Sequence, residues 1–123
     1  MFIRFITTGG TIDKIYFDAL SQFEVGESQI SHILGEGLVE FDYDVVPLLQ
    51  KDSLDVTDDD RARLREYIAE DEAERYVITH GTDTMPETAD ALRGIQGKTI
   101  VLTGALSPAR FKTTDAVFNV GMA

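Results

Sequence analysis

Residues 75–81 are RYVITHG, an apolar run of β-forming side chains that stops at a glycine. Continuous apolar runs of this length are typical of strands buried on both faces of a parallel sheet. Pro86 follows shortly afterwards, and proline is favoured in the first turn of a helix. Leu92 and Ile95 then continue an apolar stripe at helical spacing. We therefore expect a buried strand followed directly by a helix.

The same alternation extends from this segment in both directions along the chain. Further strands are predicted at residues 2–8, 42–49 and 98–103, and Pro47 indicates that the second of them lies near an edge. Helices are predicted around residues 29–38, after Thr57, and toward residue 123. Strand and helix in alternation predict an α/β fold with a parallel sheet covered on both faces. We expect a flavodoxin-like three-layer α/β/α arrangement with strand order 2-1-3-4, since right-handed crossovers are strongly preferred.

One segment departs from this alternation. Residues 14–27 favour an irregular hairpin, with residues 15–17 (IYF) on one arm and residues 23–25 (FEV) on the other. The turn between the arms is expected at residues 18–21. Gly26 and this turn would allow the hairpin to move as a lid.

Composition narrows the classes of function. The chain has 123 residues, which fits one domain, and 22 acidic against 11 basic side chains give a net charge of −11. Such a charge argues against nucleic acid or an anionic membrane surface as a partner. There is no cysteine, hence no disulfide and no thiolate metal site. No apolar run approaches the roughly 20 residues that span a bilayer, and no signal peptide is evident, so a cytoplasmic protein is expected.

Three of the predicted strand ends carry glycine and hydroxyl side chains. They are residues 7–11 (TTGGT), 80–84 (HGTDT) and 103–105 (TGA). Ligands of doubly wound sheets bind at the carboxyl ends of the strands, glycines allow close approach of the backbone, and hydroxyls supply nucleophiles. A binding or catalytic site is therefore predicted here, the alternative being ordinary turns capped by Thr and Asp.

Two other interpretations of these ends are weaker. Neither G-x-G-x-x-G nor the P-loop pattern follows the first strand, so nucleotide binding has little support. His80 would need further ligands to hold a metal, and His32, the only other histidine, lies on a distant predicted helix. A structural histidine is therefore favoured. The acidic segment from Asp58 to Glu74 is interpreted as a solvated face, with an interaction surface as the alternative.

The motifs themselves resemble those of the L-asparaginase family. The resemblance rests on residues 8–12 (TGGTI), residues 80–85 (HGTDTM) followed by ETA at 87–89, residues 101–106 (VLTGAL), and Asp52-Ser53. It runs in order along nearly the whole chain. It implies hydrolysis of the asparagine side-chain amide to aspartate and ammonia, with no metal or organic cofactor.

The resemblance also implies a role for each motif residue. Thr11 would be the nucleophile that forms an acyl-enzyme, and Thr82 the second reactive hydroxyl. Asp83 would bind the substrate α-amino group, while backbone N–H groups near Thr11 and Thr82 would stabilise the oxyanion. The substrate-binding positions would be Ser53 for the α-carboxylate, the Ala105 carbonyl for the leaving amide nitrogen, and Gly10 and Gly81.

The sequence departs from the family pattern at several points. Phe23 stands where the family usually has a tyrosine next to the nucleophile, and phenylalanine has no hydroxyl to relay a proton. Tyr16, on the facing arm of the hairpin, is the candidate replacement. Leu54 follows Ser53, where the family often has a polar side chain. The family's activating lysine and its second domain lie outside residues 1–123, which are expected to form an asparaginase N-terminal-like domain without the C-terminal one.

Three hypotheses follow. The first is an asparaginase-like amidohydrolase acting on asparagine or a related small amide. The second is a catalytically weak or inactive module that binds an amino acid or amide, and the third is a nucleotide-binding or structural domain. An apolar face left uncovered by the missing half predicts a homodimer or a higher homo-oligomer.

Overall fold

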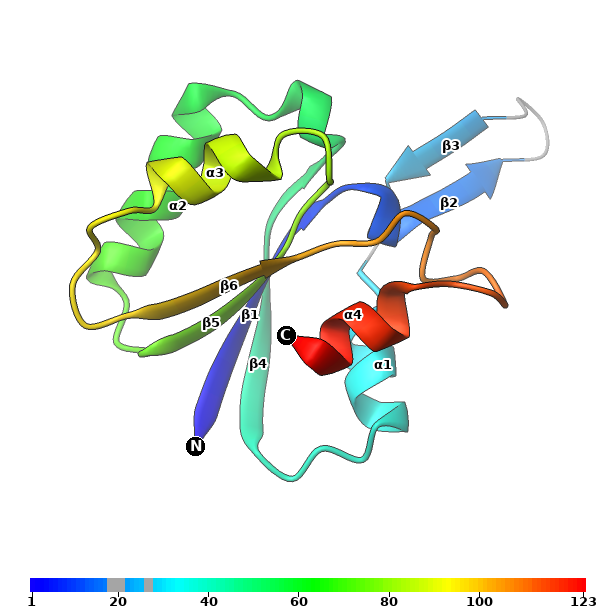
Figure 1. Ribbon diagram of the computed structural model, residues 1–123, viewed down its shortest axis with the longest axis horizontal. Coiled ribbons are helices and arrows are strands. Elements are labelled where there is room, and N and C mark those ends of the chain that lie inside the picture. Colours follow the sequence, from blue (N-terminus) through cyan, green and yellow to red (C-terminus); the bar gives the residue numbers. More distant parts are fainter. Residues whose placement is uncertain (18–21, 26–27) are drawn as a thin grey trace.

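The computed structural model describes residues 1–17, 22–25 and 28–123. Figure 1 shows strands and helices in alternation, with a hairpin inserted after the first strand. The strands are β1 (Phe2–Gly9), β2 (Lys14–Phe17), β3 (Gln22–Val25), β4 (Asp42–Lys51), β5 (Arg75–Thr79) and β6 (Thr99–Thr103). The helices are α1 (Ile30–Glu36), α2 (Asp58–Glu70), α3 (Met85–Ala91) and α4 (Ala116–Met122). Two short 3₁₀ turns, Thr11–Asp13 and Ser53–Asp55, follow β1 and β4.

Four of the strands form the main sheet, in the order β4-β1-β5-β6. Each neighbouring pair is parallel, with Thr7 opposite Thr79 and Thr79 opposite Thr103. Counted among themselves these strands have the expected order 2-1-3-4, and the labels differ only because the hairpin contributes β2 and β3. Pro47 lies in β4, at an edge of this sheet, as its missing N–H requires. The predicted α/β fold class is confirmed.

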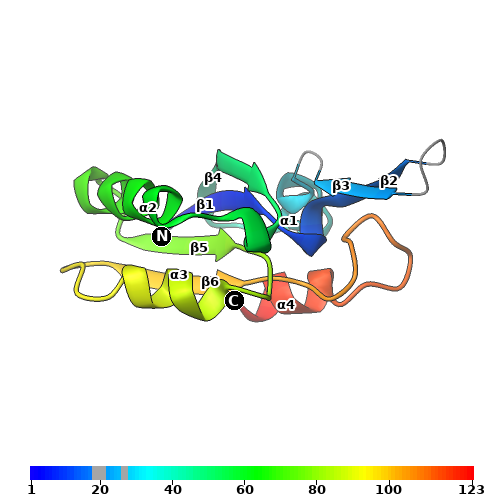
Figure 2. The same cartoon turned by 90° about the horizontal axis from the view of Figure 1, so that it is seen from above.

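Helices cover both faces of the sheet, and each face has its own apolar core. Phe5 and Val77 face α1 and α4, where they pack with Ile33 and Val120 among others. The opposite face packs against α2 and α3, with a core made of Ile6, Leu64, Ile68, Ala73, Tyr76, Ile78 and Leu92. Figures 1 and 2 show these helix pairs on opposite sides of the strands. The three-layer arrangement follows from alternation along the strands, since neighbouring side chains point to opposite faces.

The helix after Thr57 begins as predicted. The Thr57 hydroxyl accepts the Asp60 N–H at 3.1 Å, and the Asp60 carboxylate accepts the Thr57 N–H at 2.9 Å. This reciprocal capping box satisfies two N–H groups that the helix leaves unpaired. The buried stripe, however, runs through Arg61, Leu64 and Ile68. Ala62 and Ala69, each one position after a residue of this stripe, are exposed.

The hairpin is also present, with β2 and β3 antiparallel and Tyr16 opposite Phe23. Figure 1 shows it projecting beyond the carboxyl end of β1, away from the sheet. The turn at residues 18–21 and Gly26, which carry the predicted mobility, lie outside the described residues, and so do the side chains of Tyr16 and Phe23. No helix in the described ranges is long and apolar enough to cross a membrane.

Candidate active site

The carboxyl ends of the four parallel strands are tied together by hydrogen bonds at one edge of the sheet. The Gly10 N–H donates to the Lys51 carbonyl, and the His80 N–H donates to the Thr103 carbonyl, both at 2.9 Å. The Thr8 hydroxyl donates to the carbonyl of Thr79 at 2.7 Å. The three strand ends predicted from the sequence to meet therefore do so, and the end of β4 joins them.

Two glycines allow these strand ends to approach one another closely. Gly10 has φ 89° and ψ −176°, a conformation open essentially to glycine alone. A Cβ on Gly10 would lie 2.4 Å from the Gly81 nitrogen, and a Cβ on Gly81 would lie 2.6 Å from the Ser53 hydroxyl oxygen. The predicted substrate-binding positions Gly10, Gly81 and Ser53 thus form one continuous contact.

The predicted reactive side chains around this contact differ in their exposure to solvent. Thr11 opens the 3₁₀ turn after Gly10 and is half-buried. Thr82 and Asp83 follow Gly81 and are exposed, so a ligand can reach both. Ser53 is 1% exposed, and its hydroxyl is one of two buried side-chain atoms, in the part of the chain the structure describes, that have no hydrogen-bond partner. An unpaired buried hydroxyl of this kind needs an explanation, and a ligand is one.

The loop that carries Thr82 and Asp83 is anchored at both ends. The Thr84 hydroxyl donates to the Ser53 carbonyl at 2.7 Å, which joins this loop to the one after β4. At the other end, the His80 Nδ1 lies 2.7 Å from the Gly81 carbonyl oxygen and its Nε2 lies 2.8 Å from the Thr88 hydroxyl. The exposed residues between these anchors therefore stand on a fixed base.

His80 is 1% exposed and is fully engaged by these two partners. Burial lowers the pKa of His80 and the nearby Arg61 acts in the same direction, against the hydrogen bond to Gly81 and the charge of Glu87. The ring is therefore neutral at pH 7. Among the residues that the structure describes, no three His, Cys, Asp or Glu side chains are grouped so that they could hold a metal ion. These contacts agree with a structural histidine.

The Ala105 segment is held from the other side. The Asn119 amide donates to the Gly104 carbonyl at 2.9 Å, and the Asp115 carboxylate accepts the N–H groups of Leu106 and Ser107. These backbone donors lower the pKa of Asp115. A Cβ on Gly104 would lie 2.3 Å from the His80 carbonyl oxygen, so this loop also packs directly on the end of β5. Ala105 is buried beside it.

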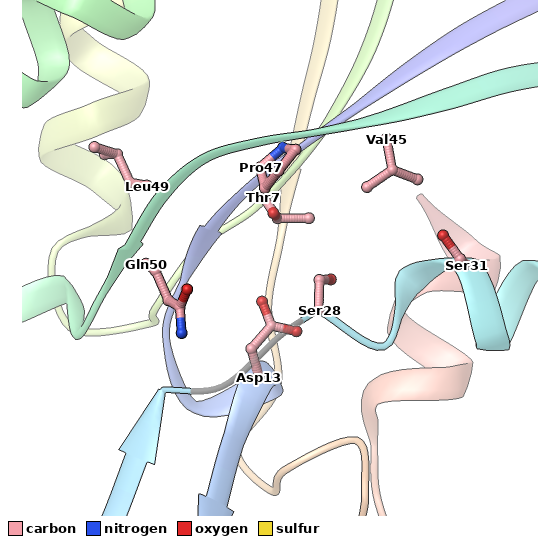
Figure 3. A pocket seen from close by; sticks show the side chains of 9 residues that line it. Thr7, Asp13, Ser28, Ser31, Val45, Pro47, Leu49 and Gln50 are labelled. Carbon is pink, nitrogen blue, oxygen red and sulfur yellow. The ribbon is translucent and has the colours of Figure 1, made fainter.

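A separate cavity of about 410 Å³, lined by both polar and apolar residues, lies between β1, β4 and the start of α1. Figure 3 shows Thr7, Asp13 and Ser28 around it, with the Asp13 carboxyl group pointing toward the open space. None of the residues predicted for catalysis or substrate binding lines this cavity. Asp13 is 1% exposed, and burial raises its pKa to about 6.

Replacing Asp13 by asparagine is expected to stabilise the protein at pH 8 but not at pH 3.5. The unfolded chain, with an ordinary carboxyl pKa near 4, releases this proton more readily than the folded one. The free energy of unfolding therefore falls as the pH rises from about 4 to about 6, by about 3 kcal/mol. Asparagine cannot ionise, so urea unfolding at several pH values should show a smaller fall for the variant.

Asp52→Asn provides a control for which the expected change in stability at pH 8 has the opposite sign. A hydrogen bond from Lys14, at 2.9 Å, lowers the pKa of Asp52. Its contribution to stability is present above about pH 4 and is lost as the pH falls through the lowered pKa, so Asp52→Asn should be less stable than the wild type at pH 8. Parallel pH profiles for Asp13→Asn and the wild type would contradict the assignment for Asp13.

Sequence reasoning missed three residues of this region. Asp13 was overlooked because a carboxylate two positions after the nucleophile candidate suggests a turn, and nothing in its spacing indicates burial. Arg61 had a signal, since it lies three and seven positions before Leu64 and Ile68 and so on their helix face. Thr88 belongs to the ETA motif, but its partners His80 and Arg61 become visible only in three dimensions.

Fold and site together define a doubly wound α/β domain whose hydroxyl and carboxylate side chains gather at the carboxyl ends of parallel strands. The chain matches the family model described as "Asparaginase, N-terminal" over residues 2–123, and it belongs to the asparaginase family. The resemblance found in the motifs is thereby confirmed. A comparison with curated proteins gave no match.

Solved structures agree with this membership. L-asparaginase I from Vibrio cholerae is 28% identical, with a TM-score of 0.80 over 97% of this chain and 38% of the other. The thermostable L-asparaginase from Thermococcus kodakarensis is 27% identical, with a TM-score of 0.75 over 98% of this chain and 38% of the other. A protein described as a probable cytoplasmic L-asparaginase from Campylobacter jejuni is 29% identical, with a TM-score of 0.68 over 97% and 37%. The chain thus spans less than two-fifths of the length of these relatives.

Proposed function

We propose that this chain acts as an asparaginase-type amidohydrolase, converting the side-chain amide of L-asparagine or a related small amide to the acid and ammonia. Family membership and the L-asparaginase neighbours support the class of reaction. The observation that carries the proposal furthest is the contact between Gly10, Gly81 and Ser53, which holds the loops bearing Thr11 and Thr82 against each other.

In the proposed reaction, the Thr11 hydroxyl oxygen attacks the amide carbon of the substrate and loses its proton. The tetrahedral intermediate places negative charge on the former carbonyl oxygen, where preorganised backbone N–H groups near Thr11 and Thr82 stabilise it. The C–N bond then breaks as the leaving nitrogen takes up this proton and departs as ammonia, and an ester joins the acyl group to Thr11. Water hydrolyses this ester, which releases aspartate and restores the hydroxyl.

The remaining predicted residues bind the substrate. Asp83 is exposed beside Thr82 and takes the α-amino group, while the Ser53 hydroxyl takes the α-carboxylate and the Ala105 carbonyl accepts from the amide nitrogen. The unpaired state of the Ser53 hydroxyl supports its role, since a carboxylate would supply the missing partner. Because the Gly81 backbone covers Ser53 and the 81–84 loop is anchored at both ends, carboxylate binding there requires the Ser53 side chain to change rotamer.

The proposal also covers the cellular location and the oligomeric state of the protein. Like the Campylobacter relative, the chain would be cytoplasmic. It would also form a homodimer or a higher homo-oligomer, because Val117, Phe118 and Met122 of α4 are 50%, 70% and 72% exposed. Large apolar side chains grouped on one exposed helix are typical of an association surface.

The hairpin β2–β3 is proposed as a lid over Thr11 whose proton-relay position holds Phe23. We expect Phe23→Tyr to raise kcat for asparagine, because general acid–base assistance is worth roughly 10²–10⁴-fold. Tyr16→Phe should remove most of the remaining activity if Tyr16 is the substitute relay. Initial rates of ammonia release measure both effects. Unchanged kcat in both variants would mean that the proton acceptor lies elsewhere.

The proposed function is tested by measuring ammonia and aspartate release from L-asparagine with the full gene product, alongside L-glutamine and other small amides. Release of both products in equal amounts supports the hydrolase. Saturable binding of asparagine without release, measured by calorimetry, would instead identify a module that holds an amino acid or amide. If the protein shows neither binding nor release, both hypotheses are rejected.

A further inference from the structure

A chain of buried hydrogen bonds connects helix α2 to the loop that carries Thr82. The Arg61 Nε–H donates to the Thr88 hydroxyl oxygen at 3.0 Å, and that hydroxyl lies 2.8 Å from the His80 Nε2. The His80 Nδ1 lies 2.7 Å from the Gly81 carbonyl oxygen. Thr88 and His80 are both 1% exposed and Arg61 is 9% exposed, so water does not compete for these contacts.

The direction of each hydrogen bond follows from its partners. A carbonyl oxygen can only accept, so the His80 Nδ1 must carry a proton and donate it to Gly81. Because the neutral ring carries its one proton on Nδ1, Nε2 can only accept, so the Thr88 hydroxyl, which accepts from Arg61, donates its own proton to the His80 Nε2. The chain therefore fixes one neutral tautomer of His80, with Nδ1 protonated and Nε2 acting as acceptor.

This tautomer has a consequence for the next peptide group. The Gly81–Thr82 peptide is trans, and the C=O and N–H of a trans peptide point in opposite directions. Because the His80 ring holds the Gly81 carbonyl on the buried side, the Thr82 N–H points away from the ring. It therefore faces outward with the exposed Thr82, where the substrate is proposed to bind.

We infer that His80, Thr88 and Arg61 are positioning residues that aim the Thr82 N–H at the developing oxyanion. The inference rests on the proposed function for its catalytic meaning, whereas the tautomer and the direction of the Thr82 N–H can be tested without it. The three residues contact no substrate themselves. They fix one peptide plane, and they come from α2, from α3 and from the end of β5.

The test compares Thr88→Val, which removes the bridging hydroxyl, with Thr88→Ser, which keeps it. The matched control is Thr79→Val. Thr79 is 0% exposed, and its hydroxyl has no hydrogen-bond partner among the described residues, so the same substitution there removes no contact. A His32→Gln background leaves His80 as the single histidine, since His32 is on the exposed face of α1.

The first readout is ¹⁵N NMR of the imidazole and of the Thr82 amide. In the parent protein at pH 7 we expect a neutral ring with Nδ1 protonated and Nε2 bare. In Thr88→Val the Nε2 and Thr82 amide resonances should both shift, while Thr88→Ser and Thr79→Val should leave them nearly unchanged. A ring protonated on Nε2 in the parent, or a Thr82 amide that does not respond to Thr88→Val, would overturn the inference.

The second readout is steady-state kinetics. Loss of a single oxyanion donor costs roughly 10²–10³-fold in kcat, so a misdirected one in Thr88→Val should cost about 10-fold or more with KM little changed. Thr88→Ser should recover most of this loss, and Thr79→Val should behave as the parent. Equal kcat for Thr88→Val and Thr79→Val would reject the positioning role. A protein without amidase activity would reject the proposed function, and the NMR comparison would still decide the placement of the Thr82 N–H.

Discussion

Replacing Thr11 by alanine is expected to lower ammonia release from L-asparagine by about 10³-fold or more, in line with the loss of a nucleophile in other enzymes. Thr11 lies directly after Gly10, whose backbone is fixed by the Lys51 carbonyl and by contact with Gly81. Thr11→Ser should retain part of the activity because it keeps the nucleophilic oxygen.

The controls separate a chemical effect from a structural one. Thr99→Ala changes an exposed threonine at the start of β6, away from the strand ends, and should leave turnover intact. The thermal midpoint of Thr11→Ala should stay near that of the wild type, since Thr11 is only half-buried. If Thr11→Ala keeps its activity while Thr82→Ala loses it, the nucleophile is Thr82 and the roles of the two threonines must be exchanged.

The second large effect is expected for Gly10→Ala, which should destabilise the fold as well as abolish turnover. The new Cβ would lie 2.4 Å and 2.6 Å from the nitrogen and Cα of Gly81, and neither backbone atom can turn aside as a side chain would. Backbone strain and overpacking each cost about 1–3 kcal/mol, so the free energy of unfolding should fall by about 2–6 kcal/mol. Urea unfolding followed by circular dichroism measures this change.

Gly94→Ala is the matched control for this prediction. Gly94 also has a positive φ, 80°, but a Cβ added there would meet nothing within 4 Å. Its cost should therefore be that of backbone strain alone, about 1 kcal/mol. If the two variants unfold at the same urea concentration, the close approach of Gly10 to Gly81 does not contribute to stability, and the β1–β5 contact at the site is looser than the structure shows.

Much of this fold follows from local pattern. The apolar centre of the run at 75–79 and its counterparts in β1 and β6 define strands, because strands inside a parallel sheet carry near-continuous apolar side chains. Thr57 marks the start of α2 because its hydroxyl and the following carboxylates satisfy free N–H groups. The end of α3 at Ala91 was not foreseen, since Leu92 and Ile95 continue the apolar spacing while the backbone has already left the helix.

The site was predictable only in outline. The positions of Thr11, Ser53 and Thr82 at strand ends follow from the topology of a parallel sheet. The roles of Arg61 and Asp13 do not, because each depends on partners contributed by another segment: Arg61 donates to a hydroxyl 27 positions away, and Asp13 accepts from the Gln29 N–H. Periodicity identifies which positions are buried apolar ones, but it cannot show which charged side chain finds a partner inside.

Pro47 in β4 also affects the tendency of the protein to aggregate at high concentration. In the described chain β4 is an edge of the sheet, and its 10 residues present a long open row of backbone groups. Such an edge is a template to which a strand of another molecule can add, the first step of aggregation. Proline has no N–H to donate to an incoming strand, so Pro47 divides this row of backbone groups into two shorter pieces. Asp42 and Asp44 lie in the first piece, and Lys51 ends the second. The edge should therefore resist fibril-like stacking even though the strand beside it, β1, is largely apolar.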